Sequence, residues 1–171
     1  MLFLNNDIDY NYFIFKFTTF LDFWTFFCFV YRFLFVGLMS RVGLMLKHQG
    51  RLEEAEIMYR RALEGRERLL GSEHPDTLGS VNNLGALLQN LGQLKEAEIM
   101  LRRALEGRER LLGSDHRNTL NSRGNLGLLL IKQNNDQGKI MVNTILAALL
   151  DPPHSLPNAH PWIQKFTDGL K

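Results

Sequence analysis

Apolar positions between residues 50 and 133 recur at the spacing of one helix face. In the first long segment, apolar or small residues fall three, four or seven positions apart, at Leu52, Ala55, Tyr59, Ala62 and Leu69. A second, shorter stripe follows at Leu78, Val81, Leu84, Leu87, Leu88 and Leu91. Gly50 precedes the long segment and Gly71 follows it, where a glycine C-cap is common. The pattern predicts a long helix over 52–70 and a shorter helix over 77–91.

The same pattern recurs farther along the chain. Residues 54–78 align with residues 96–120 at an offset of 42, and 21 of the 25 aligned positions are identical. Such a period is the signature of a repeat architecture, in which each unit packs on its neighbours. We therefore predict an all-α fold, an α-solenoid of antiparallel helix pairs, with further helices over 94–112 and 119–133.

Two details of the unit predict local structure. A glycine inside a helix costs about 1 kcal/mol relative to alanine. Gly65 and Gly107 occupy the same phase of the repeat, which indicates close approach by a neighbouring helix at both places. Side-chain caps are expected at the starts of the two shorter helices, from Asp76 or Thr77 and from Asn118 or Thr119.

These residues resemble the tetratricopeptide repeat, a helix-turn-helix module with small residues where its helices pack tightly. With Leu78 as position 1, the family's positions 7, 8, 11, 20, 24 and 27 hold Leu84, Gly85, Leu88, Ala97, Leu101 and Ala104. The 42-residue period and the run LLGSEHPDTLGSVNNLGALLQNLGQLKEAE are similar to the kinesin-light-chain type. The resemblance implies about two and a half repeats within residues 37–150, with Ala62 and Ala104 buried against a neighbouring helix.

The third unit departs from this pattern. Lys139 and Asn143 occupy positions 20 and 24, where a small and a large apolar residue belong, although residues 140–150 could form an apolar helix in a slipped register. Residues 151–171 form a proline-containing tail. Its apolar residues are spaced for a short helix that caps the stack, at Trp162, Phe166 and Leu170.

Residues 1–36 form an aromatic, apolar leader that contains 11 of the 12 phenylalanines. Within the run 13–39, Asp22 and Arg32 interrupt the apolar stretch that a membrane span requires. Three interpretations remain open: a membrane anchor, a buried helix covering the first repeat, or a leader unrelated to the repeats. Basic residues follow the run, so an anchor would leave the repeats on the cytoplasmic side.

Charge and motifs exclude several classes of function. A formal net charge of +2 is too small for a general nucleic-acid binder. The single cysteine, Cys28, excludes an internal disulfide framework. The chain has no glycine-rich phosphate loop, zinc spacing or nucleophile elbow, so we predict no enzyme activity, cofactor or metal. His74 and His116 have acidic neighbours, but their shared phase favours a scaffold turn over a metal or acid–base site.

The candidate binding residues lie on the shorter helices, because first helices of stacked repeats line a concave face. Position 6 holds Arg41, Asn83 and Asn125 in successive units. The resemblance implies that asparagine at this position holds a peptide, and an amide both donates and accepts hydrogen bonds. We expect Asn83 and Asn125 to share the concave surface and to lie outside the core. Nearby candidates are Asn82, Gln89, Asn90 and Lys132. The alternative is an ordinary solvated helix face.

The favoured function is therefore a non-catalytic, cytoplasmic interaction module that binds an extended peptide of a partner protein. The main alternative is a structural or oligomerising fragment whose open repeat ends stack on other repeats. A third interpretation is a regulatory piece of a larger signalling protein.

Overall fold

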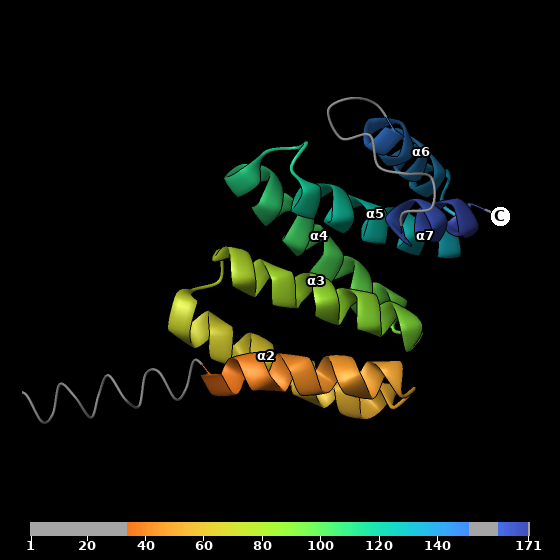
Figure 1. The fold of residues 1–171 in the computed structure, drawn as a ribbon. Coiled ribbons are helices and arrows are strands. Elements are labelled where there is room, and N and C mark those ends of the chain that lie inside the picture. The colour runs from red at the N-terminus through yellow and green to blue at the C-terminus, as the bar shows by residue number, and fades with distance from the viewer. Residues whose placement is uncertain (1–33, 151–160, 171) are drawn as a thin grey trace, which may run out of the picture.

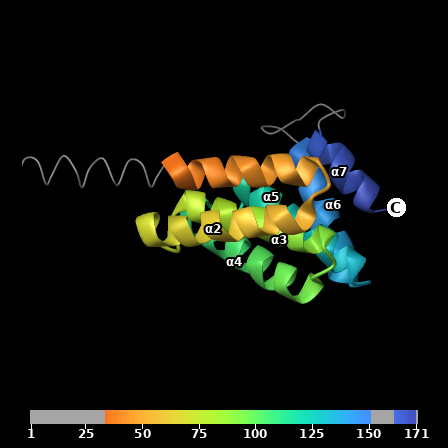
Figure 2. The ribbon, with the colours of Figure 1, turned by 90° about the horizontal axis from the view of Figure 1, so that it is seen from below.

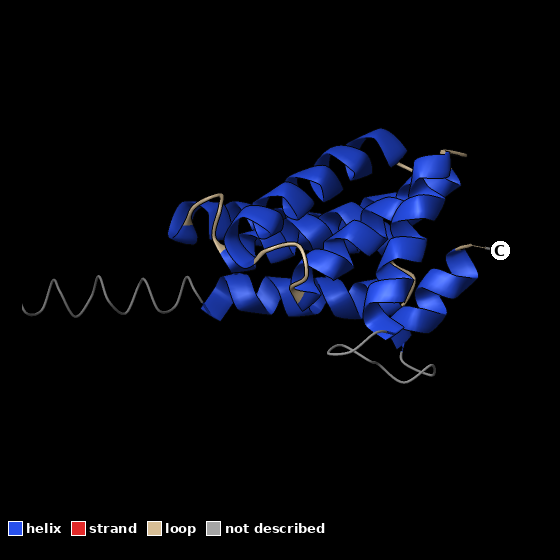
Figure 3. Ribbon diagram, turned by 90° about the horizontal axis from the view of Figure 1, so that it is seen from above, coloured by secondary structure: helices blue, strands red, loops and turns tan. Residues whose placement is uncertain are grey.

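The computed structural model describes residues 34–150 and 161–170, which form a stack of helices with no strand among them (Figures 1 and 3). A first helix covers residues 34–48 of the described part. It is followed by α2 (Leu52–Leu70), α3 (Pro75–Asn90), α4 (Leu94–Leu112), α5 (Arg117–Lys132), α6 (Asp136–Leu150) and α7 (Pro161–Gly169). The predicted α-solenoid of helix pairs is confirmed. The interpretations of the leader concern residues 1–36, of which residues 1–33 lie outside the described residues.

The two longer helices begin and end where the sequence predicts, and the two shorter ones begin two residues earlier than expected. Pro75 is the first residue of α3, a position that needs no backbone N–H. His74 is the N-cap, because its Nδ1 accepts a hydrogen bond from the Asp76 N–H at 3.2 Å. His116 caps α5 in the same way at 3.1 Å from the Asn118 N–H. The expected caps were therefore wrong, and both histidines act as scaffold residues in these turns.

The close-packing predictions from small residues are confirmed. Ala62 and Ala104 are 1% and 0% exposed. A Cβ atom built on Gly107 would lie 2.7 Å from the Leu78 side chain, and one on Gly65 would collide with Val36. The absence of a side chain at these two glycines therefore lets helix 34–48 and α3 pack against the ends of α2 and α4.

The third unit keeps the fold by shifting its register by one residue. Val142 faces Gly127 as Leu101 faces Gly85. Val142 is therefore the structural equivalent of Leu101, from which it is separated by 41 residues rather than 42. Gly138 is buried in the place that Ala97 takes in α4, while Lys139 and Asn143 are exposed. The shift arises at the start of α6.

The first turn of α6 is tighter than that of α4. The Gly138 N–H donates to the Asn135 carbonyl three residues back, whereas the Ala97 N–H donates to the Gln93 carbonyl four residues back. The tighter turn brings apolar residues onto the buried face one position early. A Cβ on Gly138 would lie 2.6 Å from the Gly127 carbonyl oxygen, so a residue without a side chain is required there.

The C-terminal helix α7 packs on α5 and α6 (Figure 1). The Phe166 side chain is 1% exposed and lies against Gly124. Leu128 of α5 contacts Gly169, and Leu170 joins the same apolar cluster. Gly124 is the repeat equivalent of Asn82, whose side chain contacts α5. Helix α7 thus packs on α5 at the position where α5 packs on α3.

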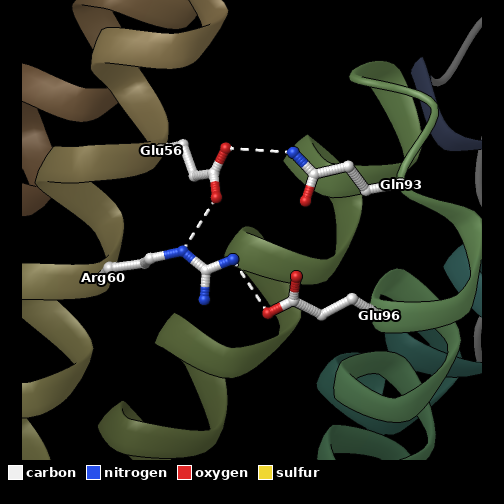
Figure 4. Close-up of polar contacts among 4 residues, drawn as sticks. All are labelled: Glu56, Arg60, Gln93 and Glu96. Carbon is white, nitrogen blue, oxygen red and sulfur yellow. Dashed lines mark hydrogen bonds and ion pairs between the residues drawn. The ribbon is translucent and has the colours of Figure 1, made fainter.

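Ion pairs link the second helices of neighbouring units. Arg60 donates from Nε to Glu56 and from Nη2 to Glu96, at 2.8 Å each, so it joins α2 to α4 (Figure 4). Gln93 donates to the second Glu56 oxygen at 3.3 Å. Arg103 of α4 donates in the opposite direction, to Glu67 of α2 at 2.7 Å. Arg60 and Arg103 are thus each neutralised by a glutamate of the adjacent repeat.

Candidate functional site

A pocket of about 330 Å³ opens where helix 34–48, α3, α5 and α7 converge. We call it the groove. Figure 2 shows helix 34–48, α5 and α7 toward one side of the molecule and α4 toward the other. The groove is lined by Ser40, Arg41, Leu44, Lys47, Tyr59, Asn82, Asn83, Ala86, Asn121, Asn125 and Lys165.

Hydrogen bonds between amide side chains form the floor of the groove. The Asn125 Nδ2 group donates to Asn82 Oδ1 and to Asn121 Oδ1, at 3.1 Å each. Asn82 Oδ1 also accepts from the Ser122 hydroxyl at 3.1 Å. The Lys165 ammonium donates to Asn125 Oδ1 at 2.6 Å. Asn125 therefore connects α3, α5 and α7 through a single amide.

Two repeat-equivalent arginines support this floor from beneath. Arg108 of α4 is 8% exposed and donates from Nη1 to the Ser122 hydroxyl at 2.7 Å and to the Asn118 carbonyl at 3.0 Å. Burial lowers the pKa of Arg108. Arg66 donates from Nη1 to the Ser40 hydroxyl at 2.7 Å and also to the Ser80 hydroxyl. The 42-residue phase these arginines share was the sequence signal for this role.

The structure gathers some of the predicted residues and leaves others out. Arg41, Asn82, Asn83 and Asn125 all line the groove. The other three candidates, Gln89, Asn90 and Lys132, do not line it. They lie at the far ends of α3 and α5, where the Lys132 ammonium donates to the Gln89 carbonyl at 3.0 Å.

The expectation that both position-6 asparagines lie outside the core holds for one of them. Asn83 is exposed, but Asn125 is only 4% exposed and fully engaged in the amide network. The reason is α7, which covers the part of α5 that no later repeat covers. Asn125 therefore contributes to the groove as a structural amide, and Asn83 is the amide that faces solvent.

The groove is basic, a property that the sequence analysis missed. Arg41, Lys47 and Lys165 line it, and none of the described residues in its lining is Asp or Glu. Lys165 as a whole is exposed, yet its ammonium end points into the groove. Burial lowers the pKa of Lys47. Burial is the main cause that lowers the pKa of Lys165, and the positive charge of Lys47 lowers it further.

Comparison with known proteins matches this architecture. A family model described as "Tetratricopeptide repeat" matches residues 37–76 and 77–118, the units that carry helix 34–48 through α4. Residues 37–118 are two tetratricopeptide repeats. A search of curated proteins gave no match. Within the described residues, no helix is both long and apolar enough to cross a lipid bilayer.

Solved structures similar to this chain are repeat proteins of the kinesin-light-chain type. BtubC (BKLC) from P. vanneervenii is 23% identical with a TM-score of 0.69, over 81% of this chain and 55% of that one. The putative kinesin light chain of Podosopora anserina, with nearly identical TPR-like repeats, is 20% identical with a TM-score of 0.60, over 79% and 63%. This chain therefore spans little more than half of the structures it matches. At these identities the likeness establishes the fold alone, a scaffold of stacked helical repeats.

Proposed function

We propose that this chain binds a partner protein through an extended peptide segment that lies in the groove. The observation that carries the proposal is the convergence of repeat-equivalent side chains from different helices on one hollow. Arg41 of helix 34–48, Asn83 of α3 and Asn125 of α5 all line it, although 42 residues separate each from the next. Stacked repeats present extended binding surfaces of this kind.

The chemistry of the lining suits a peptide. Asn83 is exposed, and its amide can donate to a peptide carbonyl and accept from a peptide N–H. Leu44, Tyr59 and Ala86 add apolar surface to the same hollow. Such surface would take an apolar side chain of the ligand while the amide holds its backbone. The groove thus offers both the orientation and the contact area that peptide recognition requires. We place this activity in the cytoplasm.

A peptide array probed with the full chain tests this function. We expect selected peptides to bind the parent, and Asn83→Ala and Arg41→Ala to weaken binding about five- to tenfold each, because each change removes one polar contact. Arg102→Ala is the matched control, since Arg102 pairs with Glu98 at 2.8 Å on the surface away from the groove. Equal binding by parent and groove variants would overturn the proposal, as would the absence of any bound peptide.

A second function, as a structural or oligomerising fragment, is favoured by one observation at the N-terminal edge. Met45 is 62% exposed, whereas its repeat equivalent Leu87 is 0% exposed beneath the preceding unit. Leu38 on the same helix is 52% exposed. This edge could receive the last helix of another repeat. Concentration-dependent assembly in analytical ultracentrifugation, lost on Met45→Gln, would support this second function.

A further inference from the structure

One isoleucine in the second helix of each repeat lies on the face opposite the core. Ile57, Ile99 and Ile140 are 50%, 65% and 67% exposed on α2, α4 and α6. Each lies midway between two buried residues of its helix, and a helix turns by about 100° per residue, so the isoleucine faces outward. Because stacked repeats place equivalent residues side by side, the three form a row, which we call the isoleucine ladder.

The three second helices follow one another on a single surface. Arg60 of α2 donates to Glu96 of α4 at 2.8 Å (Figure 4). Gln133, in the turn before α6, donates to Glu98 of α4 at 3.2 Å. None of the three isoleucines lines the groove, so this surface is separate from the proposed peptide site.

The ladder continues into the third repeat, where other exposed positions differ. Ile140 follows Ile99 by 41 residues, the spacing that also relates Val142 to its equivalent. At that spacing, Arg102 and Glu106 of α4 correspond to uncharged residues of α6. The isoleucine thus recurs where neighbouring charges do not, although it adds nothing to the core. This favours a contact between the ladder and another molecule.

The charges around the ladder are complementary to those of a second copy of the chain, turned by a two-fold axis through Ile99. The facing helices are then antiparallel, and α2 of one copy faces α6 of the other. Arg61 lies four residues after Ile57. Asp136 lies four residues before Ile140, so it meets Arg61 across the interface. Arg61 has no ion-pair partner among the residues that the structure describes, and the Asp136 side chain is 93% exposed.

The middle helix α4 contributes one attractive and one repulsive pair. Glu96 and Arg102 lie three residues before and after the middle isoleucine, so each meets the other in the second copy. Lys95 and Arg103 lie four residues before and after it and meet in the same way, but Glu67 already neutralises Arg103 at 2.7 Å. The two-fold axis forms every pair twice, so attraction prevails over repulsion.

We propose that this chain forms a two-fold dimer through the isoleucine ladder, with Ile99 on the axis and Ile57 against Ile140 of the second copy. Both copies of such a dimer use the same surface, and the ladder is symmetric about its middle member. The isoleucines supply the apolar contact, and the ion pairs fix the antiparallel orientation. Small interfaces are weak, so we expect a dimer that dissociates on dilution.

Sedimentation equilibrium of the full chain at low salt tests the dimer. We expect a monomer–dimer equilibrium whose Kd rises at least about tenfold in Ile99→Lys, because this change puts two like charges on the axis. Leu111→Lys is the matched control, since Leu111 is 49% exposed on α4 but lies outside the ladder. Met45→Gln should also keep the dimer, whereas assembly through the N-terminal edge requires Met45. Circular dichroism verifies that each variant keeps its helices.

Charge reversal tests the orientation of the two copies. Arg61→Asp and Asp136→Arg should each weaken the dimer about three- to tenfold, because each turns an attractive pair into a repulsive one. The double variant should regain the parent Kd, since its charges are reversed but again complementary. Two single losses that add up in the double variant would contradict this pairing.

Introduced cysteines test the position of the axis, in a Cys28→Ser background that leaves no other thiol. On mild oxidation, Ile99→Cys should form a covalent dimer, because a residue on the axis meets its own copy at disulfide distance. Ile57→Cys alone should not, but a mixture of Ile57→Cys and Ile140→Cys chains should.

Three results would overturn the proposal. One is a parent that stays monomeric at every concentration, which would leave the ladder to a different protein. Another is a dimer whose Kd is the same in Ile99→Lys as in Leu111→Lys. The third is efficient crosslinking of Ile57→Cys to itself, which would place the axis on α2.

Discussion

The ring of Phe166 lies against the α-carbon of Gly124 in α5. Any residue other than glycine at this position would place its Cβ atom into the ring. The contact joins α7 to α5, which is the first helix of the third repeat. It buries Phe166 within a cluster that includes Leu120, Val142 and Ile145. One missing side chain thus decides whether α7, and with it Lys165, reaches the groove.

Gly124→Ala should loosen α7. The added Cβ collides with the Phe166 ring, so we expect a loss of about 1–3 kcal/mol in the free energy of unfolding, as for an overpacked core. Hydrogen exchange within residues 161–170 should increase more than that of α3. Gly37→Ala is the control, because no atom of the described residues lies within 4 Å of a Cβ built there. That change should be neutral or stabilise by up to about 1 kcal/mol. Equal effects at both glycines would contradict the assignment.

Ala104→Leu should destabilise the stack. Ala104 is 0% exposed in the centre of α4, and a larger side chain must displace its neighbours at a cost of about 1–3 kcal/mol. Urea unfolding followed by circular dichroism measures the change. Ala147→Leu on the exposed face of α6 should leave the midpoint nearly unchanged. An unaltered midpoint in Ala104→Leu would mean that this face of α4 does not pack as described.

The histidine caps should be measurable. His74→Ala and His116→Ala each remove the acceptor for one backbone N–H at a helix start, which costs about 0.5–2 kcal/mol. His116→Asn should recover most of the loss, because asparagine is a strong N-cap residue. Thermal unfolding of the three variants tests this. A histidine that could be replaced by alanine without cost would have a role other than capping.

Lys47→Gln should raise the pKa of Lys165. Burial, the larger cause, still lowers that pKa in the variant, but the repulsion from the Lys47 charge is gone. Removal of a neighbouring positive charge favours the protonated ammonium, so the pKa moves back toward its ordinary value of 10.5. Nuclear magnetic resonance of ¹³C-methylated lysines follows the titration. Lys139→Gln should cause no such shift, and a shift of equal size there would refute the proximity of Lys47 and Lys165.

The helix pairs were predictable because the same apolar pattern occurs in two successive repeat units. Leu52 to Leu69 and their copies 42 residues later define the long helices to the residue, and Gly65 with Gly107 indicates their close contacts. The histidine caps were missed because an imidazole nitrogen is not among the common N-cap acceptors. The register of α6 was left open, because a one-residue shift depends on whether the first hydrogen bond spans three residues or four.

The groove was predictable only in part, for a different reason. Repeat phase places Arg41, Asn83 and Asn125 on equivalent helices, and this requires no knowledge of how the chain ends. The contribution of Lys165 depends on a helix outside the repeat, docked by shape complementarity between Phe166 and Gly124. The apolar spacing within residues 161–170 predicts a helix that caps the stack, but it does not identify Gly124 as the residue on which that helix packs. The burial of Asn125 follows from the same contact, so it could not be predicted from the sequence either.

The packing of α7 on α5 also decides where further repeats can be added to this chain. A further unit added after α6 would compete with α7 for the same strip of α5, at Gly124 and Leu128. Duplication of an internal unit meets no such competition, because α3 with α4 already joins a preceding unit to a following one. A second copy of residues 71–112 inserted at Gly113 would therefore lengthen the molecule while its terminal helix keeps its contacts.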